Sequence, residues 1–209
     1  MHPMLTIAVK AARRAGNIIN KASLNLDLLN VSKKSHSDYV SEVDGAVEDA
    51  IIKILLTAYP DHAILAEESG RQGDHKKSEY QWIIDPLDGT TNFLQQIPIY
   101  PVSVGLVHEG RIVLGIVSDV EQKETFYAWK GGGAWCNGEK ISVSNRTDVQ
   151  DAVVATGFPY SSRDVLPELT AVFEYFLKNA RGIRRLGSAA IDLAYVACGR
   201  FDVYYETTL

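Results

Sequence analysis

The densest group of residues able to do chemistry is the run 85–93, Asp-Pro-Leu-Asp-Gly-Thr-Thr-Asn-Phe. Its carboxylates Asp85 and Asp88 follow the apolar stretch 82–84, and Pro86 favours an extended Asp85. The Asp-Gly-Thr-Thr part can turn into a helix start, whose backbone N–H groups bind anions. Mg²⁺ typically takes one or two carboxylates together with waters and phosphate oxygens. The run therefore predicts a magnesium site beside an anion cradle; an ordinary Asp-Gly turn with a capped helix is the alternative interpretation.

Glu67 and Glu68 form a second acidic group, which follows the short predicted strand 64–65. Binding sites gather at strand ends in layered folds of helices and strands. Both acidic groups end predicted strands, which favours a shared site. A solvated surface pair is the alternative interpretation.

The remaining candidate site residues are a group of small residues and a carboxylate near the C-terminal end of the sequence. Gly187, Ser188 and Ala189 follow Arg184, and small residues that open a helix allow a ligand to approach closely. A simple serine cap of that helix is the alternative. Glu206 follows an apolar stretch that predicts a core strand.

The hydrophobic pattern predicts the elements that position these side chains. Apolar residues recur at helical spacing in four segments and alternate or cluster as strands between them. The order of helices, antiparallel strands and helices predicts an α+β layered protein rather than a βαβ dinucleotide-binding domain. The predicted helices cover 5–22, 46–55, 164–178 and 188–197, and the main predicted strands cover 82–84, 102–107, 111–120, 124–129, 151–156 and 201–205.

Composition limits the function classes. The 209 residues carry 21 Lys and Arg against 26 Asp and Glu, a net charge of −5. We therefore expect no direct nucleic-acid or anionic-membrane binding, which needs a basic surface. Two cysteines without a CxxC spacing argue against a thiolate zinc site and fit a reducing compartment. With no apolar run of bilayer length and no signal-peptide pattern, we expect a cytoplasmic protein.

The run 85–93 resembles the first signature of the inositol monophosphatase family, and its spacing to Glu67 matches that family as well. The segments 33–44, 155–159 and 184–200 resemble the bacterial SuhB-type branch, so the resemblance covers essentially all 209 residues. It implies a layered αβαβα phosphatase fold, Mg²⁺-dependent hydrolysis of phosphomonoesters such as inositol 1-phosphate, sensitivity to lithium, and a homodimer.

The resemblance also implies residue roles. The metal ligands are Glu67, Asp85, the Leu87 carbonyl and Asp88. Glu67, Thr90 and Asp44 take part in catalysis, with Asp44 and Thr90 orienting the attacking water. The residues implied to bind substrate are Asp88, Gly89, Thr90, Arg184, Ser188, Ala189 and Glu206.

One departure bears on this expectation. The family has a second signature, Trp-Asp, shortly after the residue that matches Glu206, and the sequence ends before it. We therefore expect a single phosphatase domain over 1–209 that is incomplete at its C-terminal end. The rival hypothesis is a vestigial phosphatase that binds partners, since SuhB-like proteins are associated with bacterial transcription antitermination.

Overall fold

The computed structural model describes residues 3–24, 31–33, 39–158 and 165–207, with the backbone alone for 31–33 and 39–41. Residues 34–38 and Pro159, which contribute to the family resemblance, lie outside the described residues. The chain divides into two compact units, Met1–Lys140 and Ile141–Leu209, and each is described by itself. The expectation of a single domain stays a prediction.

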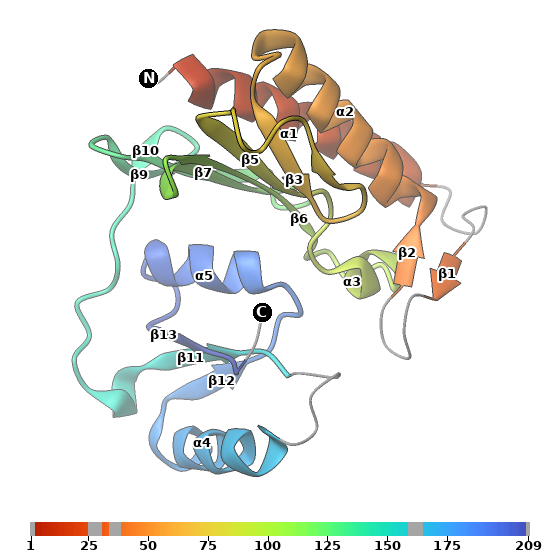
Figure 1. Cartoon of the computed structure of the whole chain (residues 1–209). Helices are drawn as coiled ribbons and strands as arrows, with labels where there is room; N and C mark the ends of the chain where they lie inside the picture. Colours follow the sequence, from red (N-terminus) through yellow and green to blue (C-terminus); the bar gives the residue numbers. More distant parts are fainter. Residues whose placement is uncertain (1–2, 25–30, 34–38, 159–164, 208–209) are drawn as a thin grey trace. The chain divides into compact units, whose positions relative to one another are not determined.

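Two long helices cover one face of the sheet in the first unit (Figure 1). They are α1 (Pro3–Ser23) and α2 (Glu42–Ala58), which pack against each other. Helix α1 buries a stripe of mostly alanines, which lets its backbone approach α2 and strands β6 and β7 closely. Leu5 and Ile19 on that stripe are fully buried.

The first unit contains an eight-stranded sheet of order β10-β9-β8-β7-β6-β5-β3-β4. Every neighbouring pair in it is antiparallel except β3 with β5, which run parallel. A separate ribbon pairs β1 with β2, and the short helix α3 (Thr90–Leu94) follows β5. The strands are β1 (Val31–Lys33), β2 (Tyr39–Ser41), β3 (Ala63–Ala66), β4 (Gly70–Gln72), β5 (Tyr80–Asp85), β6 (Pro101–His108), β7 (Arg111–Asp119), β8 (Glu124–Trp129), β9 (Gly133–Cys136) and β10 (Glu139–Lys140).

Local turn chemistry closes the hairpins of this sheet. Asn137 and Gly138 join β9 to β10 with φ values of 49° and 93°. Positive φ at both central residues is what a type I′ turn requires, and Asn-Gly meets it at low cost. The β9–β10 hairpin therefore follows from this dipeptide.

The second unit is a three-stranded parallel sheet of order β12-β11-β13 between two helices (Figure 1). Its elements are η2 (Val149–Asp151), β11 (Val153–Thr156), α4 (Leu166–Asn179), β12 (Gly182–Arg184), α5 (Ala189–Ala197) and β13 (Val203–Tyr205). Asp202 ties the incoming chain to the sheet, because its carboxylate accepts hydrogen bonds from Ser144, Arg146 and the Val153 amide. Burial would raise the pKa of Asp202, but these hydrogen bonds and the Arg146 charge outweigh it and lower the pKa.

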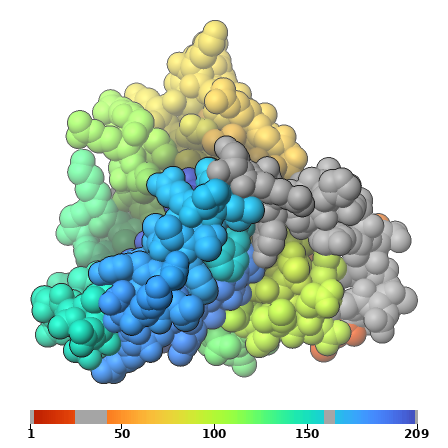
Figure 2. Space-filling view, turned by 90° about the horizontal axis from the view of Figure 1, so that it is seen from below, coloured from red at the N-terminus to blue at the C-terminus, as the bar shows by residue number. Residues whose placement is uncertain are grey.

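Helix α4 lies at the surface of the second unit, as the blue segment facing the viewer in Figure 2 shows. Its core contact is Leu169, which is buried. Leu166, Val172, Tyr175 and Leu177 are exposed. Among the described residues, no helix is both long and apolar enough to cross a bilayer.

The predicted fold class is confirmed: the protein has a layered α+β fold with helices flanking mixed sheets. The periodic helices and the antiparallel strands 102–129 also form as predicted. The pattern predicts strands at 151–156 and 201–205 without their pairing and misses β12; the structure pairs β11 in parallel with both β12 and β13. Strands of three or four residues carry too little periodicity to reveal their pairing direction.

Three aromatic rings, those of Tyr59, His62 and Tyr80, form a stack in the first unit. His62 stacks between Tyr59 and Tyr80, at 4.8 Å between ring centroids on each side. Its Nδ1 accepts a hydrogen bond of 3.0 Å from the indole of the fully buried Trp82. Because Nδ1 must be unprotonated to accept this bond, the fold requires neutral imidazole, and burial lowers the pKa of His62 although Asp61 opposes the shift.

We therefore predict a pH-dependent loss of stability that comes from His62. The pKa is 6.5 in the unfolded chain and lower in the fold, so the contribution is complete above pH 6.5 and is lost as pH falls through the lowered value. His62→Asn keeps an acceptor near Nδ1 but cannot ionise. Urea unfolding of both proteins from pH 7.5 to 5 should show a smaller loss in the variant, and parallel curves would contradict this role.

Candidate active site

Strand pairing brings the two predicted acidic groups together. Strands β3 and β5 are parallel, with Ala66 opposite Ile84, and the Glu67 amide donates to the Ile84 carbonyl at 3.1 Å. The residues that follow these strands therefore leave the same edge of the sheet. We call Glu67, Asp85 and Asp88 the acidic edge.

The turn after β5 is built by Asp85 itself. The Leu87 amide donates to Asp85 Oδ1 at 3.1 Å, an Asx-type turn in which a side chain replaces a backbone acceptor. The buried Leu87 side chain anchors the turn in the core, and the Asp88 amide donates to the Pro101 carbonyl at 3.0 Å. Asp85 and Asp88 are thereby held on a rigid loop.

Gly89 and Thr90 form the transition from this loop to α3. Gly89 caps the helix with φ 85° and ψ 41°, a left-handed conformation that side chains rarely adopt. The Thr90 hydroxyl donates to the Leu87 carbonyl at 3.2 Å, which leaves that oxygen a second lone pair for another partner. The first N–H groups of a helix have no partner within the helix, as an anion cradle requires.

The charges at the acidic edge repel one another. Burial raises the pKa of Asp85 to about 8, and the charges of Asp88 and Glu67 add to the shift, against the Leu87 amide that favours the ionised form. A cation at this place would reverse the balance, because an opposite charge within a few ångströms favours carboxylates in their charged form. The electrostatics of the acidic edge therefore fit a positively charged ligand.

Helix α2 contributes two acidic side chains to its otherwise apolar buried face. Asp44 lies in the first turn and is 2% exposed, where the helix dipole favours a negative charge. Glu48, one turn later, is also 2% exposed. Its carboxylate accepts hydrogen bonds from the Glu68 amide at 2.8 Å and the Ser69 amide at 2.9 Å.

Glu48 is not among the site residues predicted from the sequence. The available signal was a glutamate one helical turn after Asp44, among Val43, Val47 and Ile51, which form the apolar stripe of this helix. An ionisable residue on such a stripe is almost never fully buried unless it has partners. Glu48 therefore holds the segment that carries Glu67.

The remaining predicted residues lie in the second unit. Ser188 is buried and caps α5 by accepting a hydrogen bond from the Ile191 amide, and Ala189 begins that helix; the substrate-binding roles of both stay predictions. Arg184 ends β12 and is exposed, with its guanidinium on the Ile183 carbonyl. Glu206 follows β13 and accepts from the Tyr204 hydroxyl.

Gly157 lies directly against the carboxylate of Glu206. A Cβ at Gly157 would lie about 2.2 Å from the Glu206 carboxylate, so a side chain at this position would displace the end of the Glu206 side chain. The structure thus brings Glu67, Asp85, Leu87, Asp88, Gly89 and Thr90 together within the first unit, and Arg184, Ser188, Ala189 and Glu206 lie near strand ends or a helix start of the second.

The oxygen atoms at the acidic edge suit a divalent metal ion that also takes water and substrate ligands. Within the part of the chain that the structure describes, no three His, Cys, Asp and Glu side chains enclose a common metal position. Mg²⁺ does not need such a cage, because it is usually bound by one or two carboxylates with waters and substrate oxygens. Carboxylates of the acidic edge beside a backbone carbonyl are hard oxygen donors of that type, so the residues fit Mg²⁺.

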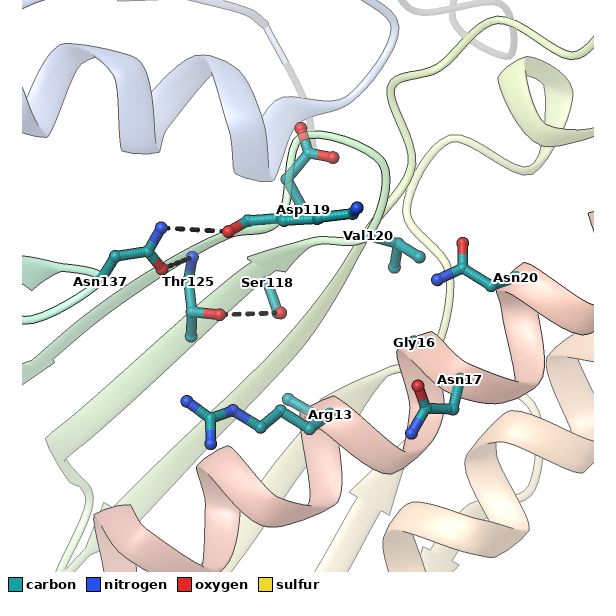
Figure 3. A pocket seen from close by; sticks show the side chains of 11 residues that line it. Arg13, Gly16, Asn17, Asn20, Ser118, Asp119, Val120, Thr125 and Asn137 are labelled. Carbon is teal, nitrogen blue, oxygen red and sulfur yellow. Dashed lines mark hydrogen bonds between the residues drawn. The ribbon is translucent and has the colours of Figure 1, made fainter.

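A separate pocket of about 330 Å³ opens between α1 and the ends of β7–β9 (Figure 3). Arg13, Asn17 and Asn20 line it from the helix, opposite hydrogen bonds that join Ser118 to Thr125 and Thr125 to Asn137. None of its lining residues belongs to the acidic edge. The acidic edge is therefore located by strand pairing and charge, and not by this cavity.

The comparisons with known proteins agree with the site. The family model described as the inositol monophosphatase family matches residues 1–209. The chain belongs to this family, and is thus a member of a phosphatase family with the layered fold described above.

Individual relatives define its branch. The chain is 44% identical over 206 residues to the Nus factor SuhB of Pasteurella multocida, covering 99% of this chain and 77% of that protein. The crystal structure of the extragenic suppressor protein SuhB from Bartonella henselae matches with a TM-score of 0.94 and 38% identity, covering 98% and 78% of the two chains. An IMPase/NADP phosphatase solved with NADP and Ca²⁺ matches with a TM-score of 0.81 and 25% identity, covering 97% and 74%.

The repulsion at the acidic edge predicts that Asp85→Asn stabilises the metal-free protein. At pH 9, above its pKa of about 8, Asp85 is mostly ionised, so the substitution removes one of three like charges while it keeps the shape and the Leu87 hydrogen bond. We expect the free energy of unfolding in EDTA to rise by about 1 kcal/mol, a melting-temperature increase of roughly 2–4 °C. Asp49→Asn, an exposed acid of α2, is the control and should change little. A destabilised Asp85→Asn would show that the cluster is not under electrostatic strain.

Proposed function

We propose that this protein is a Mg²⁺-dependent phosphomonoesterase that hydrolyses inositol monophosphate. The observation that carries the proposal is the acidic edge beside the Gly89–Thr90 turn, within a chain that belongs to the inositol monophosphatase family. Family membership supports phosphatase activity, and a divalent cation is present in the related IMPase/NADP phosphatase structure. The substrate and the metal identity are the proposed part.

In this proposal, Glu67, Asp85, Asp88 and the Leu87 carbonyl hold the ion. When bound, Mg²⁺ would activate water and neutralise charge that develops on the phosphate. The Gly89 and Thr90 amides bind phosphate oxygens, and their fixed backbone needs no reorganisation during the reaction. The Thr90 hydroxyl and the Asp44 carboxylate orient the attacking water, with Asp44 as the proton acceptor and Glu67 assisting.

The substrate hydroxyls require a second set of contacts. We assign Asp88, Ser188, Ala189 and Glu206 to the inositol hydroxyls, with Arg184 beside them. Carboxylates accept hydrogen bonds from hydroxyl groups, and small residues leave room for the ring.

A second candidate function is supported by the name of the relatives, Nus factor SuhB. We propose that the chain also contacts the transcription machinery as a protein partner, and that it acts as a homodimer in the cytoplasm. Co-purification of RNA polymerase with the wild-type chain and with a hydrolysis-deficient variant would separate the two functions. Equal recovery from both would support a role that does not depend on hydrolysis.

The hydrolytic proposal predicts that Asp88→Asn lowers kcat/KM at least tenfold. The change removes a charge and almost no volume, and a tenfold loss corresponds to about 1.4 kcal/mol of transition-state stabilisation. Phosphate release from inositol 1-phosphate with and without Mg²⁺ measures it. Glu109→Gln in the exposed β6–β7 turn serves as the control and should retain the wild-type rate. An Asp88→Asn enzyme with more than a tenth of wild-type activity would contradict the assignment.

A further inference from the structure

Glu48 fixes the backbone on which Glu67 stands. One of its carboxylate oxygens accepts from the Glu68 amide and the other from the Ser69 amide, at 2.8 and 2.9 Å. The Glu67 amide is bonded to the Ile84 carbonyl of β5 at 3.1 Å. Three successive amides after β3 are therefore held, the first by the sheet and the next two by a side chain of α2.

Burying a carboxylate at position 48 is energetically unfavourable. Glu48 is 2% exposed, and burying a carboxylate is unfavourable unless hydrogen bonds satisfy it. A neutral side chain would avoid that cost, but an amide side chain has only one accepting oxygen. A carboxylate alone offers two acceptors in one plane, which suits two adjacent N–H donors.

We propose that Glu48 is a positioning residue that sets the Glu67 carboxylate for metal binding at the acidic edge. Glu67 is exposed and its side chain hydrogen-bonds Asp85, so the place of its carboxylate depends on where the backbone starts the side chain. Asp44 lies one turn earlier on the same buried helix face. Helix α2 therefore fixes the position of Asp44, the proposed water-orienting carboxylate, and also that of the loop that carries Glu67. The inference depends on the proposed function for the identity of the ligand.

The test compares Glu48→Gln with Asp49→Asn in the full chain. Both lose one negative charge from α2, but Asp49 is exposed. In Glu48→Gln the side chain keeps its shape, and one of the two loop amides then faces an NH₂ group instead of an oxygen. Isothermal titration with Mg²⁺, at a temperature where far-UV circular dichroism shows both proteins folded, gives the dissociation constants.

We expect the Mg²⁺ dissociation constant of Glu48→Gln to rise about tenfold, the lower end of what outer-sphere partners of metal ligands typically contribute. Asp49→Asn should stay within about twofold of the wild type, since an exposed charge contributes little. If Glu48→Gln does not fold, Glu48→Asp keeps the charge but falls one methylene short, and the same weakening is expected.

The outcomes separate this inference from the proposed function. A lowered melting temperature with unchanged Mg²⁺ affinity would show that Glu48 only stabilises the fold, and would overturn the inference alone. Weakened Mg²⁺ binding in a chain whose wild type hydrolyses no inositol monophosphate would support the inference and refute the proposed substrate. A wild type that binds no Mg²⁺ would overturn both.

Discussion

The parallel pairing of β3 with β5 is the constraint on which the acidic edge depends. Parallel strands deliver their C-terminal ends to one side of a sheet, and the register Ala66 to Ile84 places Glu67 beside Asp85. These carboxylates repel each other and Asp88, so the arrangement persists only because the surrounding structure determines it. The buried Leu87, the Asp85 turn and the Glu48 clamp each fix one part of that backbone. The stability of the first unit thus supports a local arrangement that is unfavourable without a cation.

The two helices that cover the sheet have different tasks. The small side chains of α1 allow close packing, and its polar residues line the pocket between α1 and β7–β9. Helix α2 instead carries buried acids on its apolar face. Their burial is acceptable where each finds specific partners, as Glu48 does with two amides. The packing that builds the core therefore also positions the carboxylates of Asp44 and Glu48. Because Glu48 holds two amides of the loop after β3, that short loop is rigid.

The parts of the molecule governed by local rules were predictable from the sequence. The Asn137-Gly138 hairpin, the long helices and the strand that ends at Asp85 follow from turn chemistry and periodicity. The acidic edge was predictable in composition, since its residues flank predicted strands, but its assembly depends on the pairing of Ala66 with Ile84, 18 residues apart in sequence. Glu48 was missed for the same reason, because its partners belong to another element. The three-residue strand β12 was not predicted, although Arg184 at its end was noted, whereas β13 lies within the predicted strand 201–205. The roles of Arg184, Ser188, Ala189 and Glu206 stay predictions.

The central claim is that the acidic edge binds a divalent cation. A crystal of the protein grown with Mn²⁺, as a substitute for Mg²⁺ with strong anomalous scattering, tests it most directly. The account predicts an anomalous peak within about 2–2.5 Å of oxygens from Asp85, Asp88 and the Leu87 carbonyl, with Glu67 in its coordination sphere or bridged by water. An acidic edge without a peak at saturating Mn²⁺, or a peak confined to other carboxylates of the chain, would contradict it.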